Sequence, residues 1–341
     1  MGELKLDALR RQLKSGELSR CYLFFGKESY LREHYCRELR KQILGAEDDP
    51  FNLHRFDGKD LDLQELADAV DAYPSFAERS MVEVRDYDIF QAGEENNKKL
   101  QAILQDLPDY CCLLFCYDTL EFKQDRRKKQ LCEMLKNHVS LVEFPAQESG
   151  ELVRWIQRHF TAREKEISTE DAKYLIFLCG SLMDGLNNEI GKIALYAKER
   201  TITRADIDAV ATPIVEAEAF RLADALANRK YEAAAELMSK LFRLNTEPIS
   251  INAMIASQLR KMYAALLVKR AGGSADTLKE LLGAGSDYMP RQYLRICGAF
   301  SEAWYCRSLK LCAETDYQMK SSGADPNDLL LNLFLFLSAR S

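Results

Sequence analysis

Short apolar runs alternate with amphipathic stretches over the first 145 residues, and this alternation most limits the fold of the chain. Four runs have the composition of buried strands: residues 21–25, 81–84, 111–117 and 140–144. The stretches around them predict helices at 6–13, 29–44, 62–73, 94–105 and 125–137. Asp62, with Glu65 three residues later, predicts a capping box. Strands separated by such helices predict a three-layer α/β domain with a mainly parallel sheet.

After Pro145 the sequence predicts helices and no further strands. Helix starts are expected at Ser149, at Ser168 with Asp171, and at Thr203 with Asp206. Pro213 predicts a hinge, and turn-forming residues interrupt the later amphipathic helices at 245–248, 272–274, 283–290 and 323–326. We therefore predict an α/β domain, a small helical domain and a larger helical domain, at residues 1–145, 146–212 and 213–341.

The composition is that of an ordinary globular protein, with 47% hydrophobic and 29% charged residues. The formal net charge of −6 argues against a surface devoted entirely to nucleic acid. The first twelve residues lack the apolar core of a signal peptide, and the longest apolar run, residues 329–337, is too short to span a membrane. We therefore expect a cytoplasmic protein without a membrane partner, whose ten cysteines are free and mostly packed.

The first strand is followed by Gly26, Lys27, Glu28 and Ser29, in the place where a phosphate-binding loop (P-loop) would lie. Because these residues depart from the P-loop motif, we call them the degenerate nucleotide loop. A P-loop has two glycines, a lysine and a hydroxyl residue, which surround the phosphates and help to hold Mg²⁺. Here one glycine is present, and Glu28 would place negative charge where phosphate belongs. The strand at 81–84 leads into Arg85 and Asp86 rather than a pair of acids. We predict that nucleotide is not bound in the usual way.

Other catalytic signatures are missing from the sequence. Four histidines lie far apart, none beside a convincing nucleophile, and His159 is expected to be a partly buried structural residue. Cys111, Cys112 and Cys116 lie in an apolar run, for which a buried strand is favoured over a metal site. We predict no catalytic residue, no cofactor and no metal, although an enzyme of an unfamiliar kind stays open.

One segment between a helix and a strand instead suggests recognition: Tyr73, Pro74, Ser75 and Phe76. Proline is tolerated at the first position of a helix, so Pro74 is expected to start a short helix that presents Phe76 outward. An exposed aromatic side chain of this kind anchors well in a partner's pocket. The alternative is that Phe76 packs under the sheet, and the sequence leaves both interpretations open.

Two further features have a functional and a structural interpretation. The basic run Arg126, Arg127, Lys128 and Lys129 is expected near the start of a helix, where it could contact DNA phosphates, but a solvated helix face is favoured. Trp304 and Tyr305 could stack on a base, but a role in the helical core is favoured.

The order of these elements resembles the AAA+ clamp-loader plan, in particular the delta subunits of bacterial DNA polymerase III clamp loaders. The resemblance is carried by residues 22–26 with 30–31, 73–79, 188–194, 220–226, 247–249 with 258–261, and the end of the chain at Asp316, Lys320 and 324–326. It implies a degenerate AAA+ α/β domain, a small helical lid domain and a C-terminal helical collar domain. Met183 stands where active AAA+ proteins place a phosphate-contacting arginine, and a thioether cannot neutralise a phosphate.

The resemblance implies a mechanical function rather than a catalytic one. The chain would be a non-hydrolysing subunit of the DNA polymerase III holoenzyme that binds and opens the sliding clamp (beta) for loading onto primed DNA. Its implied partners are the clamp, the ATPase and delta-prime subunits of a hetero-pentamer, and primer–template DNA. The clamp contact would be Phe76 with Tyr73, Pro74 and Ser75, although the family usually has a bulky apolar residue at the position of Ser75. An active AAA+ ATPase and a helical adaptor unrelated to replication remain alternatives.

Overall fold

The computed structural model describes residues 2–243 and 247–339. Contacts among these residues group into two compact units. The first runs up to Gln147 and includes Leu182–Asp184, and the second contains Glu148–Ser181 and the residues from Gly185 onward. The further division at Pro213 into a lid and a collar stays a prediction.

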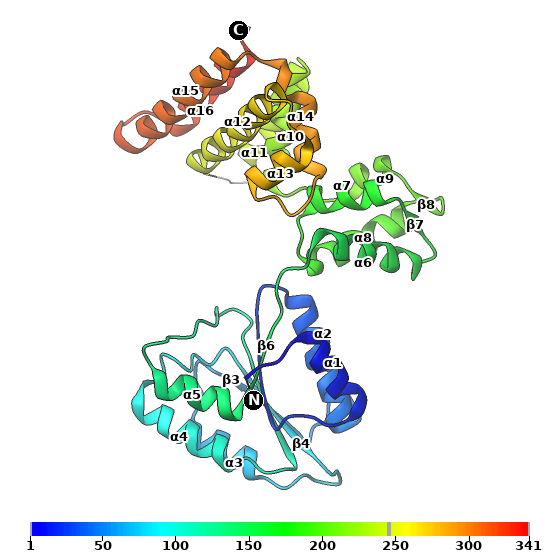
Figure 1. Ribbon diagram of the computed structural model, residues 1–341, viewed down its shortest axis with the longest axis vertical. Coiled ribbons are helices and arrows are strands. Elements are labelled where there is room, and N and C mark those ends of the chain that lie inside the picture. Colours follow the sequence, from blue (N-terminus) through cyan, green and yellow to red (C-terminus); the bar gives the residue numbers. More distant parts are fainter. Residues whose placement is uncertain (1, 244–246, 340–341) are drawn as a thin grey trace. The chain divides into compact units, whose positions relative to one another are not determined.

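Among the described residues, the first unit forms a six-stranded sheet in the order β1-β6-β2-β5-β4-β3 with every neighbouring pair parallel (Figure 1). The strands are β1 Gly2–Glu3, β2 Cys21–Phe25, β3 Leu53–Asp57, β4 Ser80–Arg85, β5 Cys111–Cys116 and β6 Ser140–Glu143. The predicted parallel sheet is confirmed. The prediction missed β1, which has two residues, and the edge strand β3, in which Leu53 is the one buried residue and the other four are at least partly exposed.

Helices cover both faces of this sheet, as Figure 1 shows. One layer consists of α1 Leu6–Ser15 and α2 Ser29–Leu44, and the other of α3 Leu63–Asp71, α4 Gly93–Gln105 and α5 Lys129–His138. Asp62 caps α3 as expected, but its side chain accepts the N–H of Gln64 rather than that of Glu65. The predicted capping box between Asp62 and Glu65 is therefore wrong. α5 was expected from residue 125 and begins at Lys129, because Asp125 accepts the N–H of Arg127 and holds a turn before the helix.

The sheet residues divide between two apolar cores because successive side chains of a strand face opposite sides. Cys111, Leu113 and Phe115 of β5 pack toward α3, α4 and α5, whereas the alternate residues Cys112, Leu114 and Cys116 pack toward α1 and α2. The prediction that this run is a buried strand with free thiols is confirmed.

The second unit opens with short elements: α6 Ser149–Thr161, β7 Glu166–Ile167, α7 Thr169–Cys179, α8 Met183–Tyr196, β8 Thr201–Ile202 and α9 Arg204–Val210. The predicted starts at Ser149, Ser168 and Thr203 are confirmed, the last as a full capping box with Asp206. The expectation of no strands is wrong, since β7 and β8 pair in parallel. Two-residue strands are too short to produce a recognisable sequence period.

Seven further helices and one 3₁₀ turn complete the described part of the chain: α10 Val215–Ala227, α11 Tyr231–Arg243, α12 Pro248–Arg270, α13 Ala275–Leu282, α14 Tyr288–Ile296, η1 Cys297–Ala299, α15 Glu302–Ser321 and α16 Pro326–Ser338. The predicted breaks at 272–274 and 323–326 are confirmed. The break expected at 283–290 ends earlier, because α14 already begins at Tyr288. Pro290 lies in the first turn of that helix, where proline is tolerated. Asn245, within another expected break, lies outside the described residues.

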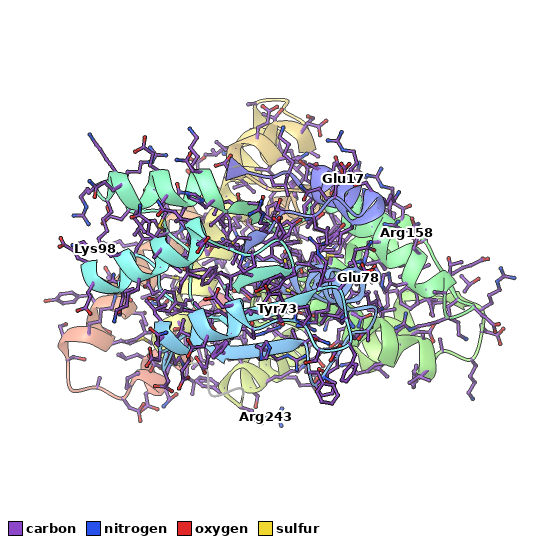
Figure 2. The ribbon with its side chains drawn as sticks, turned by 90° about the horizontal axis from the view of Figure 1, so that it is seen from below. Glu17, Tyr73, Glu78, Lys98, Arg158 and Arg243 are labelled. Atoms are coloured by element: carbon purple, nitrogen blue, oxygen red, sulfur yellow. The ribbon has the colours of Figure 1, made fainter. Side chains whose placement is uncertain are left out.

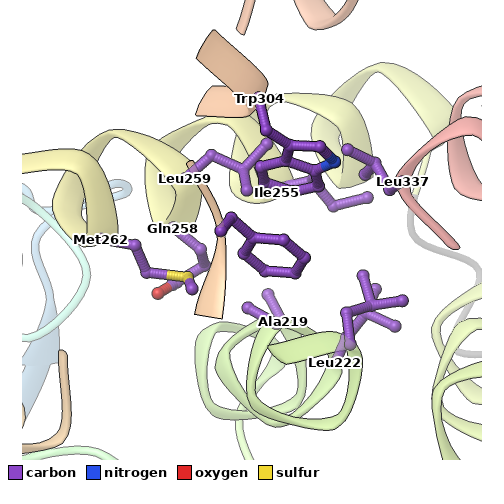
Figure 3. A pocket seen from close by; sticks show the side chains of 11 residues that line it. Ala219, Leu222, Ile255, Gln258, Leu259, Met262, Trp304 and Leu337 are labelled. Carbon is purple, nitrogen blue, oxygen red and sulfur yellow. The ribbon is translucent and has the colours of Figure 1, made fainter. Parts of the chain in front are cut away.

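The core of these helices contains Trp304 and Tyr305, which are 2% and 0% exposed. Trp304 stacks on Phe300 with ring centroids 3.7 Å apart, so the favoured core interpretation is confirmed. A crevice beside Trp304 has an accessible volume of about 10 Å³, room for roughly one water, and is lined almost entirely by apolar side chains (Figure 3). We therefore read it as a packing gap. Among the described residues, no helix combines the length and apolarity needed to cross a membrane.

Candidate functional site

The segment from residue 72 to 79 joins α3 to β4, and we call it the α3–β4 loop. Because it leads into a parallel strand, it lies at the opposite edge of the sheet from the degenerate nucleotide loop, which follows β2. Its backbone is irregular, so the expected short helix at Pro74 is wrong. Ala72 ends α3 in an extended conformation, and the φ of Phe76 is +58°, outside the right-handed helical region.

Phe76 is the most exposed of the large apolar side chains described, with a relative exposure of 106%. The interpretation that presents it outward agrees with the structure, and the alternative beneath the sheet is wrong. Tyr73 is also largely exposed, at 82%. Figure 2 labels Tyr73 and Glu78, which lie toward the two ends of the loop. The loop thus exposes two aromatic side chains three residues apart.

Tyr73 is held from one side by an aromatic contact. Its ring stacks on that of Tyr110, with centroids 4.8 Å apart and an interplanar angle of 26°. The Tyr110 hydroxyl in turn donates to the backbone carbonyl of Asp71, 2.9 Å away, at the end of α3. These contacts restrain the first half of the loop without burying Tyr73.

The second half of the loop is held by Asn52, a residue that the sequence analysis did not select. The Ser75 N–H donates to Asn52 Oδ1 at 2.6 Å, and Asn52 Nδ2 donates to the Ser75 carbonyl at 3.0 Å. Asn52 is 3% exposed and directly precedes β3. Because this bridge joins a side chain to backbone across 23 positions, no sequence period or local motif could have indicated it.

Backbone groups of the degenerate nucleotide loop form hydrogen bonds with other parts of the protein. The Gly26 carbonyl accepts from the Arg32 guanidinium at 2.7 Å, and the Glu28 N–H donates to the Phe144 carbonyl at 3.0 Å. Gly26 has a φ of +121°, and a Cβ there would lie 2.4 Å from the Phe144 oxygen. Glycine is therefore required for close packing against the end of β6, and Lys27 is exposed.

The Glu28 side chain is buried, with 0% exposure. Its Oε1 accepts the N–H of Met183, 3.2 Å away, while its Oε2 has no hydrogen-bond partner among the described residues. Met183 belongs to the short segment that packs with the first unit, and the next residue, Asp184, accepts from the Ser29 hydroxyl. Burial raises the pKa of Glu28, the Met183 N–H opposes that rise, and the charge of Asp184 adds to it.

We expect Glu28→Gln to raise the free energy of unfolding at pH 7 by on the order of 1 kcal/mol, since an amide oxygen can still accept from Met183 without a buried charge. The pKa of Glu28 is raised in the folded state, so the free energy of unfolding of the wild type falls as pH rises above about 4.3, the pKa of a glutamate in the unfolded chain. The gain should therefore vanish near pH 4. Urea unfolding at both pH values measures it, with the exposed Glu17→Gln as control; a gain of equal size at pH 4 would refute the assignment.

Behind the nucleotide loop, charged side chains are paired with one another. Glu83 of β4 is 0% exposed and lies 2.9 Å from Arg40 of α2, which is 6% exposed. Glu83 also pairs with Arg85 at 2.5 Å, and Arg85 reaches Glu33 at 3.0 Å. Burial lowers the pKa of Arg85, but the charge of Glu83 and the bond to Glu33 outweigh it and raise that pKa.

The acids at the ends of β4 and β5 belong to the same arrangement. Asp118 pairs with Arg32 at 3.1 Å and with Arg85 at 2.5 Å. Asp86 accepts the N–H groups of Asp118, Thr119 and Leu120 at 2.8 to 3.1 Å, and the Thr119 hydroxyl at 2.7 Å. Burial raises the pKa of Asp86, but these bonds outweigh it and lower that pKa. Asp86 and Asp118 thus bond to other groups of the protein at the edge of the sheet where a nucleotide-binding protein would hold Mg²⁺.

The basic run lies on the turn before α5 and at its first residue, and all four side chains are exposed. Arg127 pairs with Asp125 at 2.9 Å, and Lys128 Nζ donates to the Phe90 carbonyl. Arg126 and Lys129 have no ion-pair partner among the described residues, and both border a groove of about 600 Å³ between α5 and the sheet edge. Two of the four cations are therefore free to meet a ligand.

Two family models match this chain. One, described as DNA polymerase III, delta subunit, matches residues 22–145, and the other, described as DNA polymerase III delta subunit, C-terminal domain, matches residues 216–337. A DNA polymerase III subunit delta from Bacillus subtilis is 28% identical over 336 residues, covering 95% of this chain and 94% of the relative.

Solved structures give related matches. The Bacillus subtilis DNA clamp loader delta protein superposes with a TM-score of 0.53 and 25% identity, covering 97% of this chain and 99% of that one. The RuvB Holliday junction branch migration motor of Thermotoga maritima has a TM-score of 0.42 and 14% identity, covering 67% of this chain and 78% of that one.

Proposed function

Because the chain belongs to the DNA polymerase III delta subunit family, we propose that it is the clamp loader subunit that binds and opens the sliding clamp without hydrolysing ATP. The single observation that carries this proposal is the full exposure of Phe76 on a loop that is restrained on both sides. An aromatic side chain on a restrained loop docks with little loss of backbone conformational entropy, which favours tight binding.

Opening of the clamp follows from differential binding. A protein shifts a ring from closed to open only if it binds the open form more tightly. Moving a population from about 1% to about 99% open needs a difference of roughly 5.5 kcal/mol between the two affinities. Phe76 with Tyr73 would supply the docking contact, framed by Pro74 and Ser75, and the rest of the surface around the loop would distinguish the two ring forms.

Nucleotide hydrolysis would be left to partner subunits. The residues of the degenerate nucleotide loop do not fit a nucleotide: its backbone groups bond to Arg32 and Phe144, and Glu28 is an acid at the phosphate position. Met183, at the expected sensor position, is 3% exposed and has no cationic group. These features support a subunit whose conformation is set by the assembly rather than by its own ATP.

Assembly with the ATPase and delta-prime subunits would use the C-terminal helices. Leu331 and Leu335 lie one turn apart on α16 and are 47% and 57% exposed, and Tyr317 of α15 is 71% exposed. Exposed apolar side chains gathered on neighbouring helices are typical of subunit interfaces. Primer–template DNA would be met by the assembly, with Arg126 and Lys129 as the contact from this chain.

A binding measurement between the purified chain and the sliding clamp of the same organism tests the proposal. We expect a 1:1 complex that forms equally well without and with ATP. An absence of complex at micromolar concentrations, or a complex that requires ATP bound by this chain, would contradict the proposed function.

A further inference from the structure

The backbone at Phe76 is in a conformation that needs external support. A φ of +58° is uncommon for residues other than glycine and costs an aromatic residue free energy. Such a conformation persists only where surrounding contacts impose it. Phe76 itself contributes no packing, because its side chain is fully exposed. The support must therefore come from contacts that hold the backbone next to Phe76.

Asn52 supplies that support through a pair of hydrogen bonds to one residue. Its carboxamide accepts the N–H of Ser75 and donates to the carbonyl of Ser75, at 2.6 and 3.0 Å. The Ser75 carbonyl belongs to the peptide plane between Ser75 and Phe76. The bond from Asn52 fixes the orientation of that plane, and this orientation restricts the φ of Phe76. Asparagine suits this position because its side chain carries both an acceptor and a donor.

Asn52 is itself held rigidly. Asp49 Oδ1 accepts the N–H of Asn52 at 3.1 Å, and Asp49 Oδ2 accepts from Asn52 Nδ2 at 3.0 Å. The Asn52 carbonyl accepts the N–H of Met81 in β4 at 2.8 Å. The hydrogen bond from the Asn52 side chain, followed by that from the Phe51 N–H, holds the pKa of Asp49 below its ordinary value. The bridge therefore ties the α3–β4 loop to the sheet.

We propose that Asn52 is a positioning residue for clamp binding: it holds Ser75 so that Phe76 is already presented in its docking conformation before the clamp arrives. The inference rests on the proposed function, since it takes Phe76 as the anchor. Without the bridge, the loop would adopt the presented conformation only part of the time. The apparent dissociation constant rises in inverse proportion to the populated fraction, so a fraction of one tenth weakens binding ten-fold.

The test is a double-mutant cycle on clamp affinity with Asn52→Ala, Phe76→Ala and the combined variant. We expect Asn52→Ala to weaken binding by about ten-fold in the wild-type background and by less than about two-fold when Phe76 is already alanine. Clamp concentrations must be high enough to saturate the weaker variants. Amide hydrogen exchange of the free chains should show lost protection at Ser75 in Asn52→Ala and unchanged protection in Phe76→Ala.

Asp62→Ala is the matched control, since it removes the cap at the other end of α3 and costs comparable stability without touching Ser75. It should leave clamp affinity unchanged. Asn52→Ser is the second variant if Asn52→Ala fails to fold, because a serine is neutral beside Asp49 and too short to form both bonds to Ser75. It should weaken clamp binding as Asn52→Ala does.

The outcomes separate the two claims. Equal weakening by Asn52→Ala in both backgrounds, or none in the wild-type background, overturns the positioning role alone. Unchanged affinity in Phe76→Ala overturns both that role and the choice of Phe76 as anchor.

Discussion

Phe76→Ala is expected to weaken binding to the sliding clamp by about 30-fold or more, which corresponds to about 2 kcal/mol or more. Burying a phenylalanine side chain in a partner's apolar pocket contributes about 1.5–3 kcal/mol, and Phe76 is fully available for such burial. The variant should fold normally, because the side chain is fully exposed and its removal uncovers no core. Its free energy of unfolding should lie within about 0.5 kcal/mol of wild type.

Titration calorimetry or surface plasmon resonance with the purified clamp measures this effect. Leu195→Ala is the matched control, since Leu195 is 90% exposed at the end of α8 and its replacement removes a similar apolar surface elsewhere. The control should bind like wild type. A Phe76→Ala protein that also binds like wild type would exclude Phe76 as the anchor, and equal weakening by both variants would indicate a general loss of apolar attraction.

Glu83→Gln is expected to lower the free energy of unfolding by about 3–5 kcal/mol. The substitution keeps the shape of the side chain but removes the charge that compensates Arg40, which is 6% exposed and has only Glu33, at 3.5 Å, as a further acidic partner among the described residues. Leaving a buried guanidinium without its counter-charge is far more costly than losing a surface pair. A loss of this size would thus indicate that the buried ion pairs behind the degenerate nucleotide loop stabilise the fold.

Urea or thermal unfolding measures this loss. The control is Asp109→Asn, which breaks the exposed pair with Arg20 and should cost less than about 1 kcal/mol. Combining Arg40→Met with Glu83→Leu removes both charges and should recover much of the stability. A Glu83→Gln protein that loses less than 1 kcal/mol would mean that the buried pairs are dispensable.

The parts of the fold with strong patterns were predictable from sequence. The strand Cys21–Phe25 and the helix Ser29–Leu44 have the predicted bounds, because an apolar run ending at glycine and a long amphipathic stretch are both unambiguous. β3 was missed because Leu53 is its one buried residue, so the sequence pattern of the strand does not differ from that of a loop. The later start of α5 depends on the Asp125 turn, which competes locally with the helix.

The candidate site was predictable only in part. Phe76 stood out as an aromatic residue two positions after a proline and between two regular elements, but its conformation depends on Asn52, which is remote in sequence. Glu83 could have been noticed as an acid within an apolar strand. Its partner Arg40 lies 43 positions away, and only the folded sheet brings the two together.

The most direct test of the central claim is whether this chain opens the clamp by itself. Clamp closed around circular DNA is mixed with the chain in the absence of ATP, and clamp remaining on the DNA is measured by gel filtration. We predict rapid release of the clamp by the wild-type chain and retention of the clamp with Phe76→Ala at the same concentration. Retention of the clamp at wild-type concentrations that saturate binding would contradict the account, because the chain would then bind the ring without favouring its open form.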